Sequence, residues 1–243
     1  MDIDNTYNNY LLFNINNILS YKDIIINFII LLFFTYSFDM TLIKIFGNRA
    51  RWFQLHCLLN CIVLLNITPS LIKIICDPKT GYKLLENHNE SYYIFTLHLY
   101  HIIAFKNLTI YDYFHHILFV FLGVVPVFMY VNYNQIYLGY LPCSGLPGII
   151  EYGTLVLYKN DKITLLKQKQ ILANVYIYIR LPLCIFGITM NYMAVLNGYI
   201  KDNIYLTFYI NLLLYLNGTL FTDLTLESYY KIKYTPLKPR VFP

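Results

Sequence analysis

The residues with the clearest chemical potential are Asp112, His115 and His116, which head an apolar run that extends to Val131. A carboxylate three residues before paired imidazoles can hold one ring in a single tautomer and raise its basicity, as a general base requires. Ionisable side chains in such an apolar segment are costly, so they usually face a protein interior or a wet cavity. Two structural alternatives stay open: Asp112 could cap its helix, and the histidines could sit among lipid headgroups.

The two adjacent histidines cannot share one role. Neighbouring residues of an α-helix point about 100° apart, so His115 and His116 cannot both face one cavity. We expect one ring to point inward. The other is expected to pack against, or bond to, a neighbouring helix.

Polar residues also lie within other apolar segments of the chain. The ones that could contact a bound lipid are His56, Glu151, Arg180 and Asn217. Arg180 lies about ten residues inside its segment, which is too deep for its side chain to reach the membrane surface easily. We therefore expect it to pair with Glu151 or to bind an anionic headgroup.

The composition indicates an integral membrane protein. Of the 243 residues, 58% are hydrophobic and only 13% are charged, about half the charged share of a soluble domain. No basic leader with a small-residue cleavage site precedes the first apolar segment, so that segment is expected to act as the insertion signal. The expected fold class is all-α, a polytopic transmembrane bundle of about seven helical spans.

The expected organisation is a polar tail at 1–22, a first span with a basic turn at 23–50, a main transmembrane domain at 51–230 and a basic tail at 231–243. The predicted spans are 24–46, 52–75, 92–105, 113–131, 151–158, 171–196 and 204–224. The uncharged segment 132–148 is rich in Gly and Pro. We expect it to be re-entrant or to line a cavity, because irregular backbone is tolerated at membrane depth only where protein or water satisfies it.

Lysine and arginine are concentrated in the loops that this arrangement places on one side. The connections at 44–51 and 159–169 and the tail at 231–243 are basic, whereas lysines of the opposite loops are offset by acids. The positive-inside rule then places the C-terminus in the cytoplasm and the N-terminus in the lumen or outside. The net charge of +5 has the same explanation and favours anionic lipid headgroups.

Several functional classes find no support in the sequence. The basic residues are not interleaved into a nucleic-acid surface, so no nucleic acid is expected as a partner. Phosphate-binding, dinucleotide-binding and hydrolase motifs are missing. The five cysteines show no metal-ligand spacing, and the six histidines are too few for a site like that of the di-iron desaturases. We therefore expect neither a metal nor a resident cofactor.

Five short elements, in order between 51 and 230, resemble the TLC-domain (TRAM–Lag1–CLN8) family of membrane proteins. They are Arg51-Trp52-Phe53-Gln54-Leu55-His56, Tyr92-Tyr93-Ile94-Phe95, the D-x-x-H-H pattern of Asp112 to His116, Glu151-Tyr152-Gly153-Thr154, and Asn217 with Leu220-Phe221. The resemblance implies a barrel-like bundle of helices around a lipid-accepting cavity. It also implies membrane lipids as partners and the endoplasmic reticulum or another endomembrane as the location.

The resemblance implies two possible functions. In the Lag1 branch an acyl chain passes from acyl-CoA, as co-substrate, to the amine of a sphingoid base, with His115 or His116 as base and Asp112 or Glu151 as orienting acid. That branch carries two aspartates in the following span, and this sequence has none there. The element at Glu151 is more similar to branches linked to lipid composition, sensing or trafficking. We therefore expect a lipid-binding or lipid-handling protein, with N-acyl transfer as the alternative.

Overall fold

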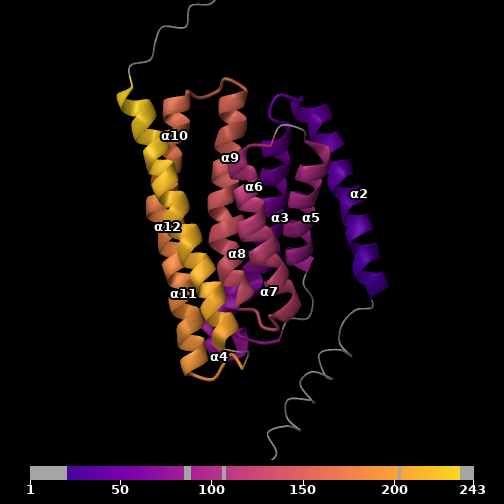
Figure 1. Cartoon of the computed structure of the whole chain (residues 1–243), viewed down its shortest axis with the longest axis vertical. Helices are drawn as coiled ribbons and strands as arrows, with labels where there is room; N and C mark the ends of the chain where they lie inside the picture. Colours follow the sequence, from indigo (N-terminus) through magenta and orange to yellow (C-terminus); the bar gives the residue numbers. More distant parts are fainter. Residues whose placement is uncertain (1–20, 85–88, 106–107, 202–203, 236–243) are drawn as a thin grey trace, which may run out of the picture.

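The computed structural model describes residues 21–84, 89–105, 108–201 and 204–235, so nearly all of the predicted tail at 1–22 and the end of the tail at 231–243 lie outside the described residues. The helices are α2 (Tyr21–Phe46), α3 (Arg51–Cys76), α4 (Pro78–Gly81), α5 (Asn89–Ala104), α6 (Ile110–His115), η1 (His116–Val124), α7 (Val125–Tyr130), α8 (Ile136–Ser144), α9 (Leu146–Lys159), α10 (Leu165–Val175), η2 (Tyr176–Arg180), α11 (Leu181–Leu196) and α12 (Ile204–Tyr234). Within the described ranges there is no strand, only an isolated bridge between Leu84 and Tyr133. The all-α class is confirmed, and the longer helices run along one common axis (Figure 1).

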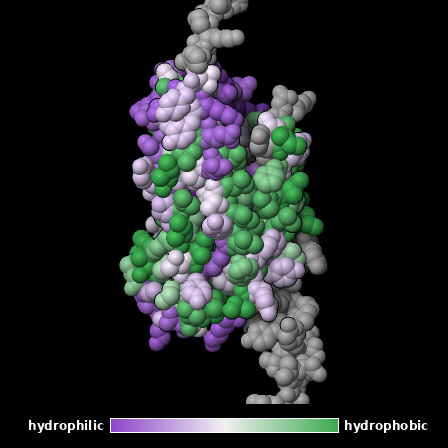
Figure 2. Space-filling model, turned by 60° about the vertical axis from the view of Figure 1, so that its left-hand side comes forward, coloured by the Kyte–Doolittle hydropathy of each residue, from purple (hydrophilic) through white to green (hydrophobic). Residues whose placement is uncertain are grey.

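Five helical segments are long and apolar enough to cross a membrane. They are Ile25–Phe46, Arg51–Cys76, Asp112–Tyr130, Leu165–Leu196 and Ile204–Tyr234. Many of their large apolar side chains are exposed, and Figure 2 shows hydrophobic residues over the middle of one face with hydrophilic residues at its two ends. Such a surface needs lipid around it, so the chain is an integral membrane protein.

Two of the seven predicted spans coincide with shorter helices. The segment 92–105 lies on α5, which has 16 residues, and 151–158 lies on α9, which has 14. Both are shorter than the roughly 20 residues that a transmembrane helix needs. Five spans are therefore supported by length, and the count of seven stays a prediction.

The segment predicted to be irregular is mostly helical. Residues 136–144 form α8, and α9 follows after a break at Gly145. A side chain at Gly145 would collide with the backbone carbonyl of Leu141, and Pro147 lies in the first turn of α9, where its missing N–H costs nothing. Glycine and proline therefore set the position of the break without removing the helices.

Two long helices change to the wider π form just before a proline. η1 precedes Pro126, and η2 precedes Pro182. A proline has no N–H to donate and clashes with the carbonyl four residues earlier, so the preceding turn loosens. For Pro126 that carbonyl belongs to Leu122, and it accepts a hydrogen bond from the Tyr209 hydroxyl of α12. The carbonyl oxygen that the proline leaves without an α-helical partner thus bonds η1 to α12.

Small residues let the C-terminal helices pack closely. A Cβ at Gly218 of α12 would lie 3.0 Å from the Cβ of Cys184, and one at Gly187 of α11 would lie 3.0 Å from the carbonyl oxygen of Leu138. Lipid tails are as apolar as leucine, so helices in a membrane associate through close packing more than through hydrophobic burial. These glycines provide that packing beside α8.

A buried charge network holds α2 against the rest of the bundle. Asp39 has no exposed surface, and both of its carboxylate oxygens accept from Nε of Arg51, at 3.0 and 2.8 Å. The Tyr100 hydroxyl of α5 donates to Oδ2 of Asp39 at 2.6 Å. The Arg51 guanidinium also lies 4.7 Å from the centre of the Phe105 ring. One carboxylate of α2 therefore ties this helix to α3 and α5.

The basic loops lie at one end of the molecule. Figure 1 shows the α2–α3 connection, the α9–α10 connection and the C-terminal end of α12 at the same end. Arg49 of the first connection forms an ion pair with Asp161 of the second. The predicted grouping of basic loops on one side is thus observed, and the compartment that they face stays a prediction.

Candidate functional site

A cavity of about 300 Å³ lies inside the bundle. Residues of α3, α5, α6, η1, α7, α8, α9, η2 and α12 line it. Six of the residues that the sequence singled out contribute to the lining: His56, Asp112, His115, Glu151, Arg180 and Asn217. His116 is buried outside the lining, so the two adjacent histidines have different surroundings, as their positions on the helix predicted.

The cavity is polar toward the end with the basic loops and apolar toward the opposite end. Along the run from α6 to α7, Asp112 precedes Val127, while on α12, which runs the other way, Asn217 follows Ile210. The apolar part is lined by Ile94, Val120, Val124, Val127, Ile136, Ile210, Leu213 and Leu214. The distribution of polar and apolar groups in this cavity matches that of an amphiphile.

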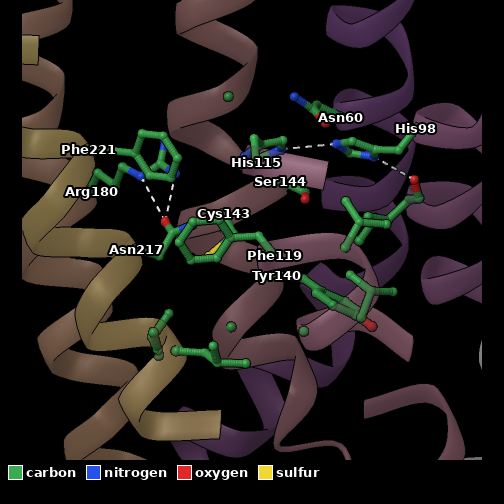
Figure 3. Close-up of a pocket in the computed structure, with 18 of the residues that line it drawn as sticks. Asn60, His98, His115, Phe119, Tyr140, Cys143, Ser144, Arg180, Asn217 and Phe221 are labelled. Atoms are coloured by element: carbon green, nitrogen blue, oxygen red, sulfur yellow. Dashed lines mark hydrogen bonds between the residues drawn. The ribbon is translucent and has the colours of Figure 1, made fainter. Parts of the chain in front are cut away.

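Arg180, at the end of η2, organises the polar wall. Its Nε and Nη2 donate to Oδ1 of Asn217 at 3.2 and 2.6 Å (Figure 3). Its Nη1 donates to the Tyr176 hydroxyl at 2.7 Å. The Tyr176 hydroxyl donates in turn to Oε2 of Glu151 at 2.6 Å. The sequence left two partners open for Arg180, and the structure gives it Glu151, with Nη1 3.8 Å from Oε2.

This network satisfies a buried charge. The Arg180 side chain is only 6% exposed, and its guanidinium also lies 4.6 Å from the centre of the Tyr176 ring and 5.3 Å from that of Phe221. Glu151 neutralises the charge, and the aromatic faces complement it. Arg180 therefore serves mainly to hold α9, η2 and α12 around the cavity, and it is not an unpaired anion receptor.

The hydrogen bonds of His98 determine which ring nitrogen of His115 carries the proton. Nδ1 of His98 lies 2.8 Å from the carbonyl oxygen of Ile94, which can only accept, so Nδ1 carries the proton. The neutral His98 ring then accepts at Nε2, which lies 3.2 Å from Nε2 of His115 (Figure 3). His115 must donate from Nε2, and its Nδ1 is the basic nitrogen. The partners assign one tautomer to a histidine of the cavity wall.

Asp112 has the alternative, structural role. Its Oδ2 accepts from the backbone N–H and the hydroxyl of Thr109, both at 2.7 Å, and the Thr109 hydroxyl accepts from the Asp112 N–H at 3.3 Å. This is a capping box at the start of α6. The hydrogen bonds of the described residues do not join Asp112 to His115 or His116, so His98 orients His115 instead.

A second group of rings begins in the cavity wall, at His56 and Tyr152, and continues behind it. His56 stacks on Tyr152 with ring centres 4.0 Å apart, and Trp52 stacks on His101 at 3.6 Å. His116 meets His101 edge-on at 5.3 Å. Among the described residues, no group of three or more His, Cys, Asp or Glu side chains is arranged to hold a metal ion. These histidines therefore pack as aromatic rings.

The structure adds site residues that sequence reasoning did not select. Tyr176 precedes Arg180 by four residues, one helical turn, but the chain has 26 tyrosines and nothing distinguishes this one. His98 comes from a different helix than His115, so only the fold reveals their contact. Gly139 lines the cavity with its backbone because it has no side chain. The sequence pointed to it only as one glycine of the segment 132–148, which was expected to be re-entrant or to line a cavity.

Comparison with known proteins does not identify the chain. No protein-family model matches it, and neither a curated protein nor a solved structure is similar to it. A TLC domain therefore stays a prediction from the sequence elements between 51 and 230.

Proposed function

We propose that the chain is an integral membrane protein that binds a lipid in this cavity and serves membrane lipid homeostasis, sensing or trafficking. The observation that carries the proposal is the polarity of the cavity. Hydrogen-bonding groups gather at one end and aliphatic side chains at the other, inside a chain that lipid surrounds. Ligand sites typically combine an apolar lining with a few convergent polar groups, and this cavity does so.

The headgroup would lie at the polar end. Nδ1 of His115 offers an acceptor there, and Asn60, Ser144 and Tyr152 add polar atoms around it. We further propose a TLC-type arrangement of seven spans in an endomembrane such as the endoplasmic reticulum, with the basic end in the cytoplasm. The ordered sequence elements and the shared end of the basic loops support this arrangement.

N-acyl transfer from acyl-CoA to a sphingoid base is the second candidate. The contact between His98 and His115 favours it, because a neighbouring acceptor fixes the tautomer and leaves a basic nitrogen on a ring that lines the cavity. Against it, Asp112 is engaged as a helix cap, and Glu151 bonds to Tyr176. No acid is thus in place to orient the base, and binding is the better supported function.

Replacing His115 by alanine should reduce the lipid retained by the purified protein. Loss of one hydrogen bond to the headgroup corresponds to roughly 3- to 10-fold weaker binding. His116→Ala is the matched control, because this neighbouring ring is buried but does not line the cavity. Native mass spectrometry of the wild type and both variants measures the bound fraction. Equal losses in the two variants would count against the assigned headgroup site.

A second experiment separates binding from catalysis. Membranes that contain the wild type or either variant are supplied with isotopically labelled acyl-CoA and a sphingoid base, and the lipids are extracted and identified by mass. A labelled N-acyl lipid formed by the wild type and His116→Ala, but not by His115→Ala, would establish the acyltransferase. Retained lipid without a labelled product would support the binding function.

A further inference from the structure

At its apolar end the cavity borders the packed core of the bundle, and Val127, Ile136 and Ile210 form this border, here called the floor. We infer that this end of the cavity holds a single hydrocarbon chain and that Val127, Ile136 and Ile210 set the longest chain that it accepts. The inference rests on the proposed lipid binding and adds the class of ligand, a lipid with one long chain. It also assigns length selectivity to three residues remote from the polar network.

The floor is part of the packed core. Val127, Ile136 and Ile210 are 8%, 2% and 7% exposed, and each belongs to the largest buried apolar cluster of the described residues. Ile67 and Ile74 of α3 belong to the same cluster and have no exposed surface. The floor is thus supported from behind, and a longer chain could pass it only by displacing core side chains, which is costly.

Open space lies just before the floor, at Gly139 of α8. A Cβ built at Gly139 would meet no atom within 4 Å, although this residue lines the cavity. Three other glycines differ, because a Cβ at Gly148, Gly187 or Gly218 would contact a neighbouring helix at 2.5, 3.0 and 3.0 Å. Gly139 therefore leaves volume for a ligand where these three glycines serve helix packing.

The volume favours one chain over two. Ligand pockets span about 300 to 1,000 Å³, and this cavity, at about 300 Å³, lies at the lower limit. It has one apolar end, between η1, α7, α8 and α12. A headgroup with one chain suits that space, and the paired chains of a bilayer phospholipid do not.

Selection by length would take the form of a cut-off. A chain that leaves the bilayer for the cavity exchanges one apolar environment for another, so added methylene groups bring little gain in affinity. A chain that is too long must instead disturb packed side chains. We expect binding to fall by roughly tenfold or more once the chain reaches the floor.

The test uses the full chain in lipid nanodiscs and native mass spectrometry with lysophosphatidylcholines of increasing chain length as probes. Gly139→Leu adds four carbon atoms to the empty space and should shorten the cut-off by roughly two to four carbons. Ile136→Ala should lengthen it by a similar amount. Leu55→Ala removes as many atoms from a fully buried side chain that belongs to a different apolar cluster and does not line the cavity, so it should leave the cut-off unchanged.

Each outcome bears on a different claim. A cut-off that shifts in opposite directions in the two cavity variants, and not in Leu55→Ala, supports the floor as a length gauge. Lysophosphatidylcholine that binds without a cut-off, or with one that no variant moves, would overturn the gauge and leave lipid binding intact. Two-chain phosphatidylcholine bound as well as the single-chain probes would overturn the ligand class. If no lipid binds the wild type, the proposed function itself fails.

Discussion

Replacing Arg180 by leucine should lower the free energy of unfolding by about 3–5 kcal/mol. The change removes the partner of the Glu151 carboxylate and leaves Asn217 Oδ1 without the two bonds that it accepts from the guanidinium. It also removes the donor to the Tyr176 hydroxyl. An uncompensated charge and unpaired polar atoms inside the bundle are far more costly than the loss of a surface ion pair. Unfolding by titration with SDS in mixed micelles measures the difference.

Two variants show whether the charge or the geometry matters. Arg180→Lys keeps the charge but cannot bond to Asn217 and Tyr176 as the planar guanidinium does, so an intermediate loss is expected. Combining Arg180→Leu with Glu151→Leu removes both charges, and much of the stability should return. A single Arg180→Leu variant within 1 kcal/mol of the wild type would show that the network does not hold the helices together.

Replacing Asp39 by alanine should cost about 3 kcal/mol and loosen α2. The Arg51 guanidinium would lose both carboxylate oxygens, and the Tyr100 hydroxyl would lose its acceptor. This loss of stability is at the lower end of the range for breaking a buried ion pair, because the Arg51 side chain is 25% exposed and can bind water instead.

The loosening can be measured as a distance. Spin labels at the exposed positions Ile29 of α2 and Ile103 of α5 report the separation of the two helices. Asp39→Ala should broaden the distance distribution between them. Ser37→Ala is the control, since this hydroxyl bonds only to the Phe33 carbonyl of its own helix. An unchanged distribution in Asp39→Ala would mean that α2 is held by apolar contacts alone.

The sequence predicted the parts of the molecule that depend on local pattern. Long apolar runs predicted the membrane helices. Gly and Pro between 132 and 148 predicted a re-entrant or cavity-lining segment; several of its residues line the cavity, although most of it is helical. The depth of Arg180 predicted pairing with Glu151 or with an anionic headgroup, and Glu151 is the partner in the structure. In each case the physical constraint acts within one segment, so a single sequence suffices to predict it.

The rest depends on which helices are neighbours. Asp112 could either take part in capping its helix or orient a histidine, because both roles need an acid at this position. Its hydrogen bonds to Thr109, the N-cap residue of α6, show that it takes part in capping. The orienting partner of His115 is His98, which comes from α5. The π segments were not predicted either, although Pro126 and Pro182 mark where they end. The link that η1 makes to α12 also depends on the fold, because the Leu122 carbonyl, four residues before Pro126, accepts a hydrogen bond from Tyr209.

Both π segments take part in the cavity wall. η1 contributes Phe119 and Val120, and η2 contributes Tyr176 and Arg180. A π turn holds more residues than an α turn and shifts the side chains that follow it. The sequence positions of these wall residues therefore could not be derived from regular α-helical spacing.

The reactivity of Cys143 reports directly on whether lipid occupies the cavity. Cys143 lines the cavity, whereas Cys76 is exposed at the end of α3. A small membrane-permeant thiol reagent is applied to lipid-loaded and delipidated protein, and both cysteines are quantified by peptide mass spectrometry. We predict slow modification of Cys143 when lipid is bound, faster modification after delipidation, and no difference for Cys76. Equal rates for Cys143 in the two preparations would contradict a lipid-filled cavity.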